Sequence, residues 1–244
     1  MSDAPRLDHV AIAVARAADA MAFLVGELGG THHSAGPGPG FRFWQLAFAR
    51  GGLIEVLEPD GPADGFVHRF LATRGPGIHH VTFKVPELRA ATARAARLGY
   101  EIVGLNDAHP AWKEAFLHPK QAQGIVVQLA ESHPELEPEA WVRPPHPAAP
   151  VPAREIADVR GIRLAATSEA AARRQWQELL GADCTQDARE LVFRWPASPL
   201  AIRVALAPDA TPGALGIEIA TSRRLRFENG GDLALGVRWL RELR

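Results

Sequence analysis

The chain has 244 residues, of which 47% are hydrophobic and 23% charged, and its formal net charge is −1 at pH 7. This composition is typical of a globular protein with one large or two small domains. The near-zero charge provides no global basic field, so we expect no nucleic-acid partner. We also expect a cytoplasmic location and no membrane partner. The reasons are the lack of an apolar signal core or membrane-length apolar run, and a single cysteine, Cys184, which excludes an intramolecular disulfide.

The first part of the chain predicts a strand, a helix and further strands, in that order. Residues 7–14 (LDHVAIAV) are rich in β-forming residues and predict a strand. Residues 17–28 have an apolar helical face and end at Gly29-Gly30, which predicts a helix. After a short segment near Thr31, residues 41–48 and 53–57 predict two strands joined by a glycine turn.

The same order of elements then returns. Residues 77–85 (GIHHVTFKV) predict a strand, residues 88–98 a helix closed by Gly99, and residues 100–103 a short strand. Residues 115–117 and 124–130 predict a hairpin around a turn at 118–120. His9 and His80 lie at equivalent points of the two copies, 71 residues apart, which indicates a duplication.

A proline-rich stretch at residues 133–152 predicts an extended linker, with Trp141 pinning it to a surface. It divides the chain into 1–132, with two paired modules, and 153–244. The second part predicts a third copy with its strands and helix at residues 159–166, 169–180, 191–195 and 200–206. Residues 215–220 open a partial fourth copy, and residues 233–243 predict a terminal helix. We therefore predict an α+β fold of repeated βαβββ modules that form curved mixed sheets.

Four polar positions fall at matching points of the first two copies. His9 and His80 lie in the first strands, and Glu55 and Gln128 follow 46 and 48 residues later in the last strands. Glu55 and Gln128 are each flanked by apolar residues, and a charge pointing into an apolar interior needs a partner. Two imidazoles, one carboxylate and one amide oxygen suit zinc, iron, nickel, cobalt or manganese. The spacing therefore predicts a divalent metal site.

The segments LDHVAIAV, GLIEVLEP, GIHHVTFKV and FLHPKQAQGIVVQLAE resemble the vicinal oxygen chelate superfamily (glyoxalase, bleomycin resistance and dioxygenase proteins) over residues 6–131. Their pattern is most similar to that of methylmalonyl-CoA epimerases. The resemblance implies His9, Glu55, His80 and Gln128 as metal ligands. It also implies an exchange, because the epimerases have glutamine at the position of Glu55 and the family usually has glutamate at the position of Gln128.

The exchange affects the expected chemistry. The resemblance implies that the two proton-transfer bases of the epimerases correspond to Gln45 and Gln128 here, and an amide cannot abstract a proton. Ordinary methylmalonyl-CoA epimerisation is therefore not expected. Glu55 is left as the one carboxylate of the predicted ligand set, acting as a ligand, a base, or both in turn.

Several positions have a second interpretation. Gln128 is either a ligand or an amide that caps the cavity without touching metal. Trp44 and Trp112 are either packing aromatics or walls of a substrate cavity that also includes Gln45. Lys120 lies either in a tight turn or at the rim, where it would meet an anionic substrate.

The third copy predicts no metal. Its first strand (VRGIRLAA) has no histidine, and Arg203 takes the place of Glu55. We interpret this copy as a packing partner, a lid or a dimer surface, and we expect exposed loop positions for His32 and His33.

The predicted function is metal-assisted chemistry next to a carbonyl, through a metal-stabilised enolate. This covers isomerases, epimerases and glyoxalase-type lyases acting on a small molecule with vicinal oxygens, such as an acyl-CoA or a keto acid, and we allow for a homodimer. One alternative is a non-haem Fe(II) dioxygenase, because two histidines and one carboxylate form its ligand triad. The other is a non-catalytic binding protein of the resistance type.

Overall fold

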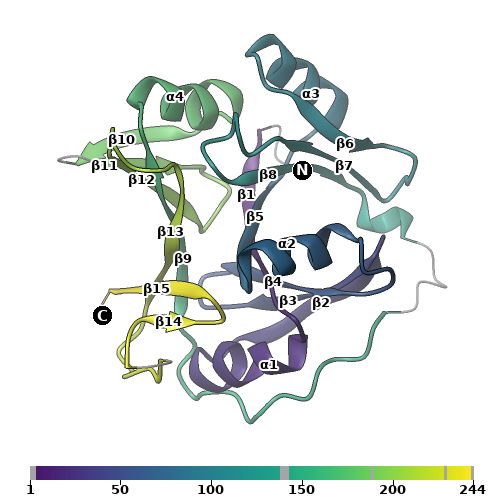
Figure 1. Ribbon diagram of the computed structural model, residues 1–244, viewed down its shortest axis with the longest axis vertical. Coiled ribbons are helices and arrows are strands. Elements are labelled where there is room, and N and C mark those ends of the chain that lie inside the picture. The colour runs from purple at the N-terminus through teal and green to yellow at the C-terminus, as the bar shows by residue number, and fades with distance from the viewer. Residues whose placement is uncertain (1–3, 138–142, 188–189, 228–229, 243–244) are drawn as a thin grey trace. The chain divides into compact units, whose positions relative to one another are not determined.

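Two β-sheets carry the fold in the computed structural model, which describes residues 4–137, 143–187, 190–227 and 230–242 (Figure 1). The eight-stranded sheet has the order β2-β3-β4-β1-β5-β8-β7-β6, and the seven-stranded sheet has the order β10-β11-β12-β9-β13-β15-β14. A four-strand block recurs three times in these orders, and in each block the first strand of a module lies beside its last. The predicted α+β fold of repeated modules is confirmed.

The elements of each module follow one another along the chain. The first module comprises β1 (Arg6–Ala13), α1 (Ala17–Met21), the π-helix η1 (Ala22–Glu27), β2 (Thr31–Gly38), β3 (Phe41–Ala47) and β4 (Leu53–Pro59). Helix α2 (Phe66–Arg74) precedes the second module, which comprises β5 (Gly77–Lys84), α3 (Leu88–Arg97), β6 (Ile102–Asn106), β7 (Trp112–Leu117) and β8 (Val126–Ser132).

The remaining elements follow the short 3₁₀ turn η2 (Pro134–Leu136). The third module comprises β9 (Asp158–Ala166), α4 (Glu169–Arg173), the π-helix η3 (Arg174–Leu179), β10 (Asp183–Asp187), β11 (Glu190–Arg194) and β12 (Ala201–Leu206). The fourth module has three strands among the described residues: β13 (Gly213–Ala220), β14 (Leu233–Ala234) and β15 (Val237–Glu242).

Particular residues mark the ends of the helices in the first three modules. Each ends at a glycine with positive φ, at Gly29 (73°), Gly99 (86°) and Gly181 (71°), as the sequence predicts. In the first two modules, a glutamate of the last strand accepts the N–H that begins the helix. Glu58 Oε2 accepts from Ala17 N at 2.6 Å, and Glu131 Oε2 accepts from Leu88 N at 2.8 Å. A carboxylate is stabilising there because the N-terminus of a helix carries partial positive charge.

The predicted terminal helix at residues 233–243 is wrong. The structure has the hairpin β14–β15 through residue 242, with Leu233 opposite Arg238 and Ala234 opposite Val237. The two residues between the strands, Leu235 and Gly236, have φ of 59° and 69°, as a tight hairpin turn requires. Burial alternates from Val237 to Trp239, which is the period of a strand and not of a helix.

Two further differences concern the first module. His32 and His33 lie in strand β2 and not in a loop, although both side chains are exposed as expected. Helix α2 was not expected from the sequence. Its Phe66, Phe70 and Leu71 pack against a buried group formed by Ala11, Ala13, Leu57 and Val67. This apolar face shows that α2 belongs to the core around β1 and β4.

Residues 143–152 of the predicted linker have neither helix nor strand. The carbonyl oxygen of Pro145 accepts a hydrogen bond from Trp44 Nε1 at 3.1 Å, and the rings of His146 and His32 lie 3.9 Å apart. The segment therefore lies along the first module. Trp141 lies outside the described residues, and the domain boundaries at residues 132 and 153 stay a prediction.

The chain forms two compact units, and each unit consists of three segments that are separate in the sequence. One unit contains Met1–His9, His80–Glu139 and Gly161–Leu215. Its core includes Phe83, whose ring lies 6.0 Å from that of Trp176 and 4.8 Å from that of Trp195. This unit therefore combines most of the second and third modules.

The other unit contains Val10–His79, Ala140–Arg160 and Gly216–Arg244. In its core, the ring of Phe23 lies 5.0 Å from that of Trp239 and 5.9 Å from that of Phe227. This unit combines most of the first and fourth modules.

Candidate metal centre

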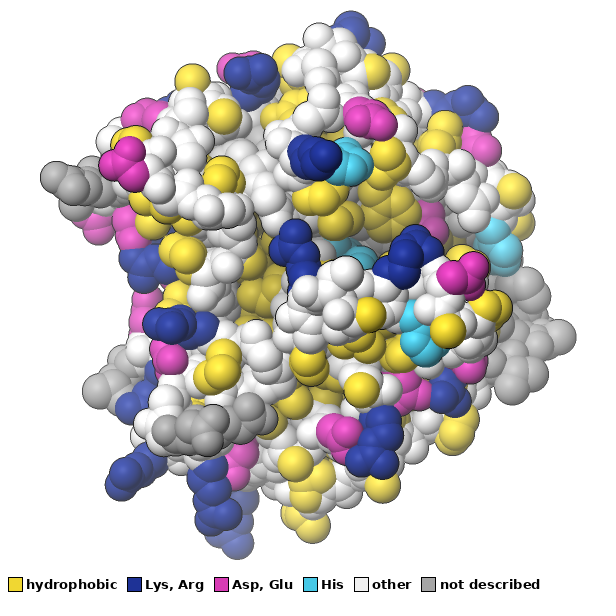
Figure 2. Space-filling model, in the orientation of Figure 1, with side chains coloured by type: hydrophobic (Ala, Val, Ile, Leu, Met, Phe, Trp, Pro, Cys, Tyr) yellow, Lys and Arg dark blue, Asp and Glu magenta, His cyan; other side chains and the backbone are white. Residues whose placement is uncertain are grey.

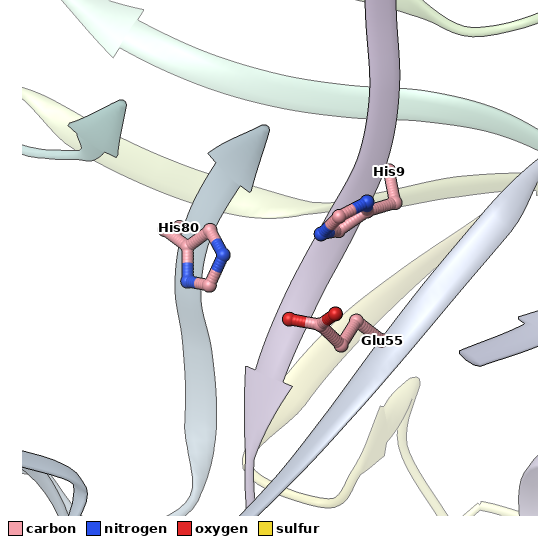
Figure 3. A group of neighbouring side chains, drawn as sticks. All are labelled: His9, Glu55 and His80. Atoms are coloured by element: carbon pink, nitrogen blue, oxygen red, sulfur yellow. The ribbon is translucent and has the colours of Figure 1, made fainter. Parts of the chain in front are cut away.

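Three of the four predicted ligands form one group. His9 on β1, Glu55 on β4 and His80 on β5 each offer a ligand atom, and these atoms all lie within 4.8 Å of one another. Figure 3 shows the three side chains extending toward one another. All three are buried, with exposed fractions of 1%, 7% and 4%. The geometry is that expected from the matching positions in the sequence; metal binding by these residues stays a prediction.

The chemistry of this donor set fits a divalent metal. A buried carboxylate is costly unless a positive charge or hydrogen bonds compensate it. Two imidazoles and one carboxylate suit zinc and the late first-row metals. Two bonds of about 2 Å span at most about 4 Å, so small side-chain movements would bring the three atoms into coordination range.

Asp8 orients the first histidine. His9 Nδ1 donates to Asp8 Oδ2 at 3.0 Å. Burial by itself would raise the pKa of Asp8, but the hydrogen bond and charge of His9, together with Lys84 and Arg6, lower it to about 2. Asp8 is therefore charged at neutral pH, and a carboxylate that accepts from Nδ1 leaves the lone pair on Nε2. Such carboxylate–histidine pairs are typical of metal sites.

A ladder of polar side chains orients Glu55. Gln45 Nε2 donates to Glu55 Oε2 at 3.0 Å, and Ser34 Oγ donates to Gln45 Oε1 at 2.8 Å. Gln45 lies directly opposite both Ser34 on β2 and Glu55 on β4, so all three side chains share one face of the sheet. Gln45 therefore positions the carboxylate, and its own acceptor oxygen is used by Ser34.

Gln128 belongs to a second polar chain. Its Oε1 accepts a hydrogen bond from Thr82 Oγ1 at 2.6 Å, and its Nε2 donates to Glu114 Oε2 at 2.7 Å. Trp112 Nε1 donates to the same oxygen of Glu114 at 3.0 Å. The amide oxygen that was predicted to bind metal thus accepts a hydrogen bond from Thr82. Both interpretations of Gln128, as a ligand and as an amide that does not touch metal, stay predictions.

The other predicted substrate-binding residues lie in different environments. Trp44 is 2% exposed and alternates with Gln45, so it lies on the opposite face of the sheet from Glu55. Trp112 is half-buried, and Lys84 Nζ lies 3.9 Å from its ring centroid. Lys120 is exposed in the turn after β7, where its backbone N–H donates to His118 Nδ1 at 3.2 Å.

His79, next to His80, packs under α2. Its ring lies 5.4 Å from that of Phe66 and 4.8 Å from that of Phe70. Burial lowers the pKa of His79 to about 4, although the charge of Glu55 opposes this shift. The imidazole is therefore neutral near pH 7 and behaves as part of the core.

The sequence analysis missed Asp8, Ser34, Thr82 and Glu114. Two of them had a usable signal. Asp8 is the direct neighbour of His9 in the sequence. Thr82 follows His80 by two residues, so these two side chains share one face of the strand. Ser34 and Glu114 could be found only from the register of β2–β3 and β7–β8, and the sequence does not fix these registers.

The outer surface carries charges of both signs. Figure 2 shows basic and acidic side chains interspersed on the face in view, in agreement with the formal net charge of −1. Within the part of the chain that the structure describes, no helix has the length and apolar character that a membrane crossing requires.

Comparison with known proteins gives relatives for the first two modules. An ethylmalonyl-CoA/methylmalonyl-CoA epimerase of Cereibacter sphaeroides is 32% identical over 134 residues, covering 52% of this chain and 97% of that protein. The mitochondrial methylmalonyl-CoA epimerase of Homo sapiens is 30% identical over 136 residues, covering 52% of this chain and 74% of that protein. The predicted resemblance to the epimerases is confirmed at this level.

A solved structure extends the likeness to both sheets. A variant of 4-hydroxymandelate synthase from Streptomyces coelicolor matches 91% of this chain and 72% of its own, with a TM-score of 0.59 and 13% identity. This match shows the fold alone. The family model described as "Glyoxalase/Bleomycin resistance protein/Dioxygenase superfamily" matches residues 8–138. The chain therefore belongs to the glyoxalase/bleomycin resistance protein/dioxygenase superfamily.

Proposed function

We propose that this chain is a metal-dependent enzyme that moves a proton at a carbon next to a carbonyl, with His9, Glu55 and His80 as its metal ligands. The observation that carries the proposal is the buried group of two imidazoles and one carboxylate. The epimerase relatives support the same reaction class. The substrate would be an acyl-CoA or a keto acid with two neighbouring oxygens, and a homodimer and a cytoplasmic location stay predictions.

The residues around the group prepare it for this chemistry. A bound divalent ion would act as a Lewis acid on the negative charge that develops on the carbonyl oxygen. Asp8 holds His9 in the tautomer that presents Nε2, and Gln45 holds one oxygen of Glu55. Because the Glu55 carboxylate lies within 4.8 Å of the ligand atoms of both histidines, we assign it the role of ligand and not that of proton acceptor.

The experiment is a metal analysis combined with a hydrogen-exchange assay. Protein purified without added metal is analysed for bound ions, and then incubated in D₂O with methylmalonyl-CoA or pyruvate as probes. We expect about one ion per chain and metal-dependent uptake of deuterium at the carbon next to the carbonyl. Protein that binds no divalent metal, or that is loaded with metal but exchanges neither probe, would contradict the proposal.

The variant Glu55→Gln tests the role of Glu55. It keeps an oxygen donor but removes the charge, so metal affinity should fall by about 10- to 100-fold, the range found when a metal site loses a supporting interaction. At saturating metal, exchange should remain within about tenfold of the wild type. A loss of about 100-fold or more at full metal occupancy would instead make Glu55 the base, because a positioned base contributes at least that much.

A non-haem Fe(II) dioxygenase is the second candidate. Two histidines and one carboxylate form the ligand triad of these enzymes, and His9, His80 and Glu55 supply that donor set. Substrate-dependent oxygen consumption by the Fe(II)-loaded protein, without deuterium exchange, would favour this reaction. Tight binding of a small molecule by metal-free protein would favour the third interpretation, a binding protein.

A further inference from the structure

Glu114 is a carboxylate that the predicted site does not include. It lies on β7 and is half-buried. Its Oε2 accepts two hydrogen bonds, from Gln128 Nε2 at 2.7 Å and from Trp112 Nε1 at 3.0 Å. Two donors on one oxygen fix the orientation of the carboxylate. Glu114 is thus a positioned carboxylate and not a mobile surface side chain.

The register of the strands places Glu114 on the same face as His80. Thr82 on β5 lies directly opposite Gln128 on β8, and Glu114 lies directly opposite Ala130. Side chains two residues apart on a strand share a face, and so do directly opposite residues. His80, Thr82, Gln128, Ala130 and Glu114 therefore line one face of the second module.

Gln128 holds this carboxylate on the face of the sheet that also carries His80, and it does so without carrying a proton itself. Its carbonyl oxygen accepts from Thr82, so its NH₂ group has to point toward Glu114. An amide has donors and an acceptor but no proton that it can release or take up at neutral pH. The position where the family usually has a glutamate is thus occupied by a group that positions the neighbouring glutamate.

Trp112 supports the same carboxylate from the other side. Lys84 Nζ lies 3.9 Å from the centroid of the indole ring, which holds the ring by a cation–π interaction. The indole N–H then donates to Glu114. Lys84 thus holds the ring of Trp112, and Thr82 holds the carbonyl oxygen of Gln128. Both Trp112 and Gln128 donate to the same oxygen of Glu114.

We propose that Glu114 is the acid–base residue of this enzyme, and that it replaces the carboxylate lost at Gln128. The inference rests on the proposed function. The Glu114 carboxylate takes a proton from the carbon next to the carbonyl, the C–H electron pair moves into the new C=C bond, and the carbonyl π pair moves onto oxygen to form the enolate. The reverse movement returns the proton to carbon, so no oxidant, reductant or other reactant is consumed.

The test uses the metal-loaded full chain and deuterium uptake into methylmalonyl-CoA or pyruvate in D₂O. Glu114→Gln keeps the size of the side chain and an acceptor for both donors, but it removes the basic group. We expect exchange to fall by about 100-fold or more, with metal content unchanged. The control Glu101→Gln removes an exposed carboxylate of the same unit and should exchange like the wild type.

Two further variants separate chemistry from structure. Glu114→Ala leaves space for a small acid, so added formate should restore part of the lost exchange, which a merely structural role would not allow. Trp112→Phe keeps the ring for Lys84 but removes the N–H donor. It should lower exchange by only about 3- to 10-fold, in proportion to one lost hydrogen bond of ordinary strength.

The outcomes distinguish this inference from the proposed function. If the wild type exchanges and Glu114→Gln exchanges within about threefold of it at equal metal content, Glu114 is not the acid–base residue and the proposed function stands. If Glu114→Ala loses exchange but formate restores none of it, the role of Glu114 is structural and the inference also fails. A wild type that binds metal without exchanging either probe overturns both.

Discussion

The second and third modules share one backbone plan but have different side chains at the same positions. In both, the first strand pairs in parallel with the last, with Thr82 opposite Gln128 in one module and Arg163 opposite Arg203 in the other. Two residues earlier along the first strand, the second module has His80 and the third has Gly161. The registers therefore show that a glycine occupies the position of the histidine proposed as a metal ligand.

The backbone of the third module excludes a ligand at that position. Gly161 has φ of 136°, and a Cβ atom there would lie far inside van der Waals contact of the backbone of Ala201. Arg163 forms an ion pair with Glu190 where the second module has the pair Thr82–Gln128. The two modules therefore share their strand pairing, and a few inward side chains decide whether a module can hold a metal.

The largest effect should come from removing the histidine that the second module has and the third module lacks. His80→Ala deletes one of three proposed ligands, so zinc affinity should fall by more than the 10- to 100-fold that loss of an outer contact produces. Arg163→Ala, two positions from the equivalent site in the third module, should leave affinity unchanged. Isothermal titration of the metal-free proteins measures both, and equal affinities of His80→Ala and the wild type would remove His80 from the site.

Adding a side chain to the third module should destabilise it. Gly161→Ala places Cβ against backbone that cannot move aside, so we expect the free energy of unfolding to fall by about 3 kcal/mol or more. Gly181→Ala is the matched control, because Gly181 also has positive φ but open space around it. It should cost about 1 kcal/mol. Urea denaturation compares the two, and equal losses would show that the close approach to Ala201 is relaxed in solution.

The helix cap of the second module should depend on pH. Burial would raise the pKa of Glu131, but hydrogen bonds from Leu88 N, Lys113 and His133 lower it to about 2. Because the pKa is lowered in the folded state, this stabilisation is fully present above the ordinary value of 4.5 and is lost as pH falls toward 2. Glu131→Gln should therefore cost about 2 kcal/mol at pH 7 and little near pH 2. A cost that does not change with pH would disprove this origin.

The cap of the third module should give the smallest effect and no such pH dependence. Leu206 stands where the second module has Glu131, and Ser168 caps its own helix instead, with Oγ accepting from Ala171 N at 3.3 Å. Ser168→Ala should cost about 1 kcal/mol at both pH 7 and pH 3. A hydroxyl does not titrate in this range, so a loss confined to neutral pH would point to an unrecognised charged partner.

The features that repeat could be predicted from the sequence, because the same pattern at matching positions of two copies supports the same interpretation twice. The strand–helix–strand order, the glycines that end the helices and the convergence of His9, Glu55 and His80 follow from matching positions in the two copies. The terminal segment was misassigned because Leu233, Leu240 and the last arginines also fit a helical period. The role of Glu114 was missed because it depends on the register of a hairpin, which a shift of one residue would reverse.

The composition of the two compact units has a consequence for biosynthesis. Phe23, near the start of the chain, packs against Trp239. Phe83 packs against Trp176 and Trp195, which also follow much later in the sequence. While the ribosome is still translating the later modules, the aromatic faces of the earlier ones have no native partner. Contacts between residues so far apart in sequence make folding slow and leave nascent chains prone to aggregation. We therefore expect the nascent chain to depend on chaperones until residue 239 has left the ribosome.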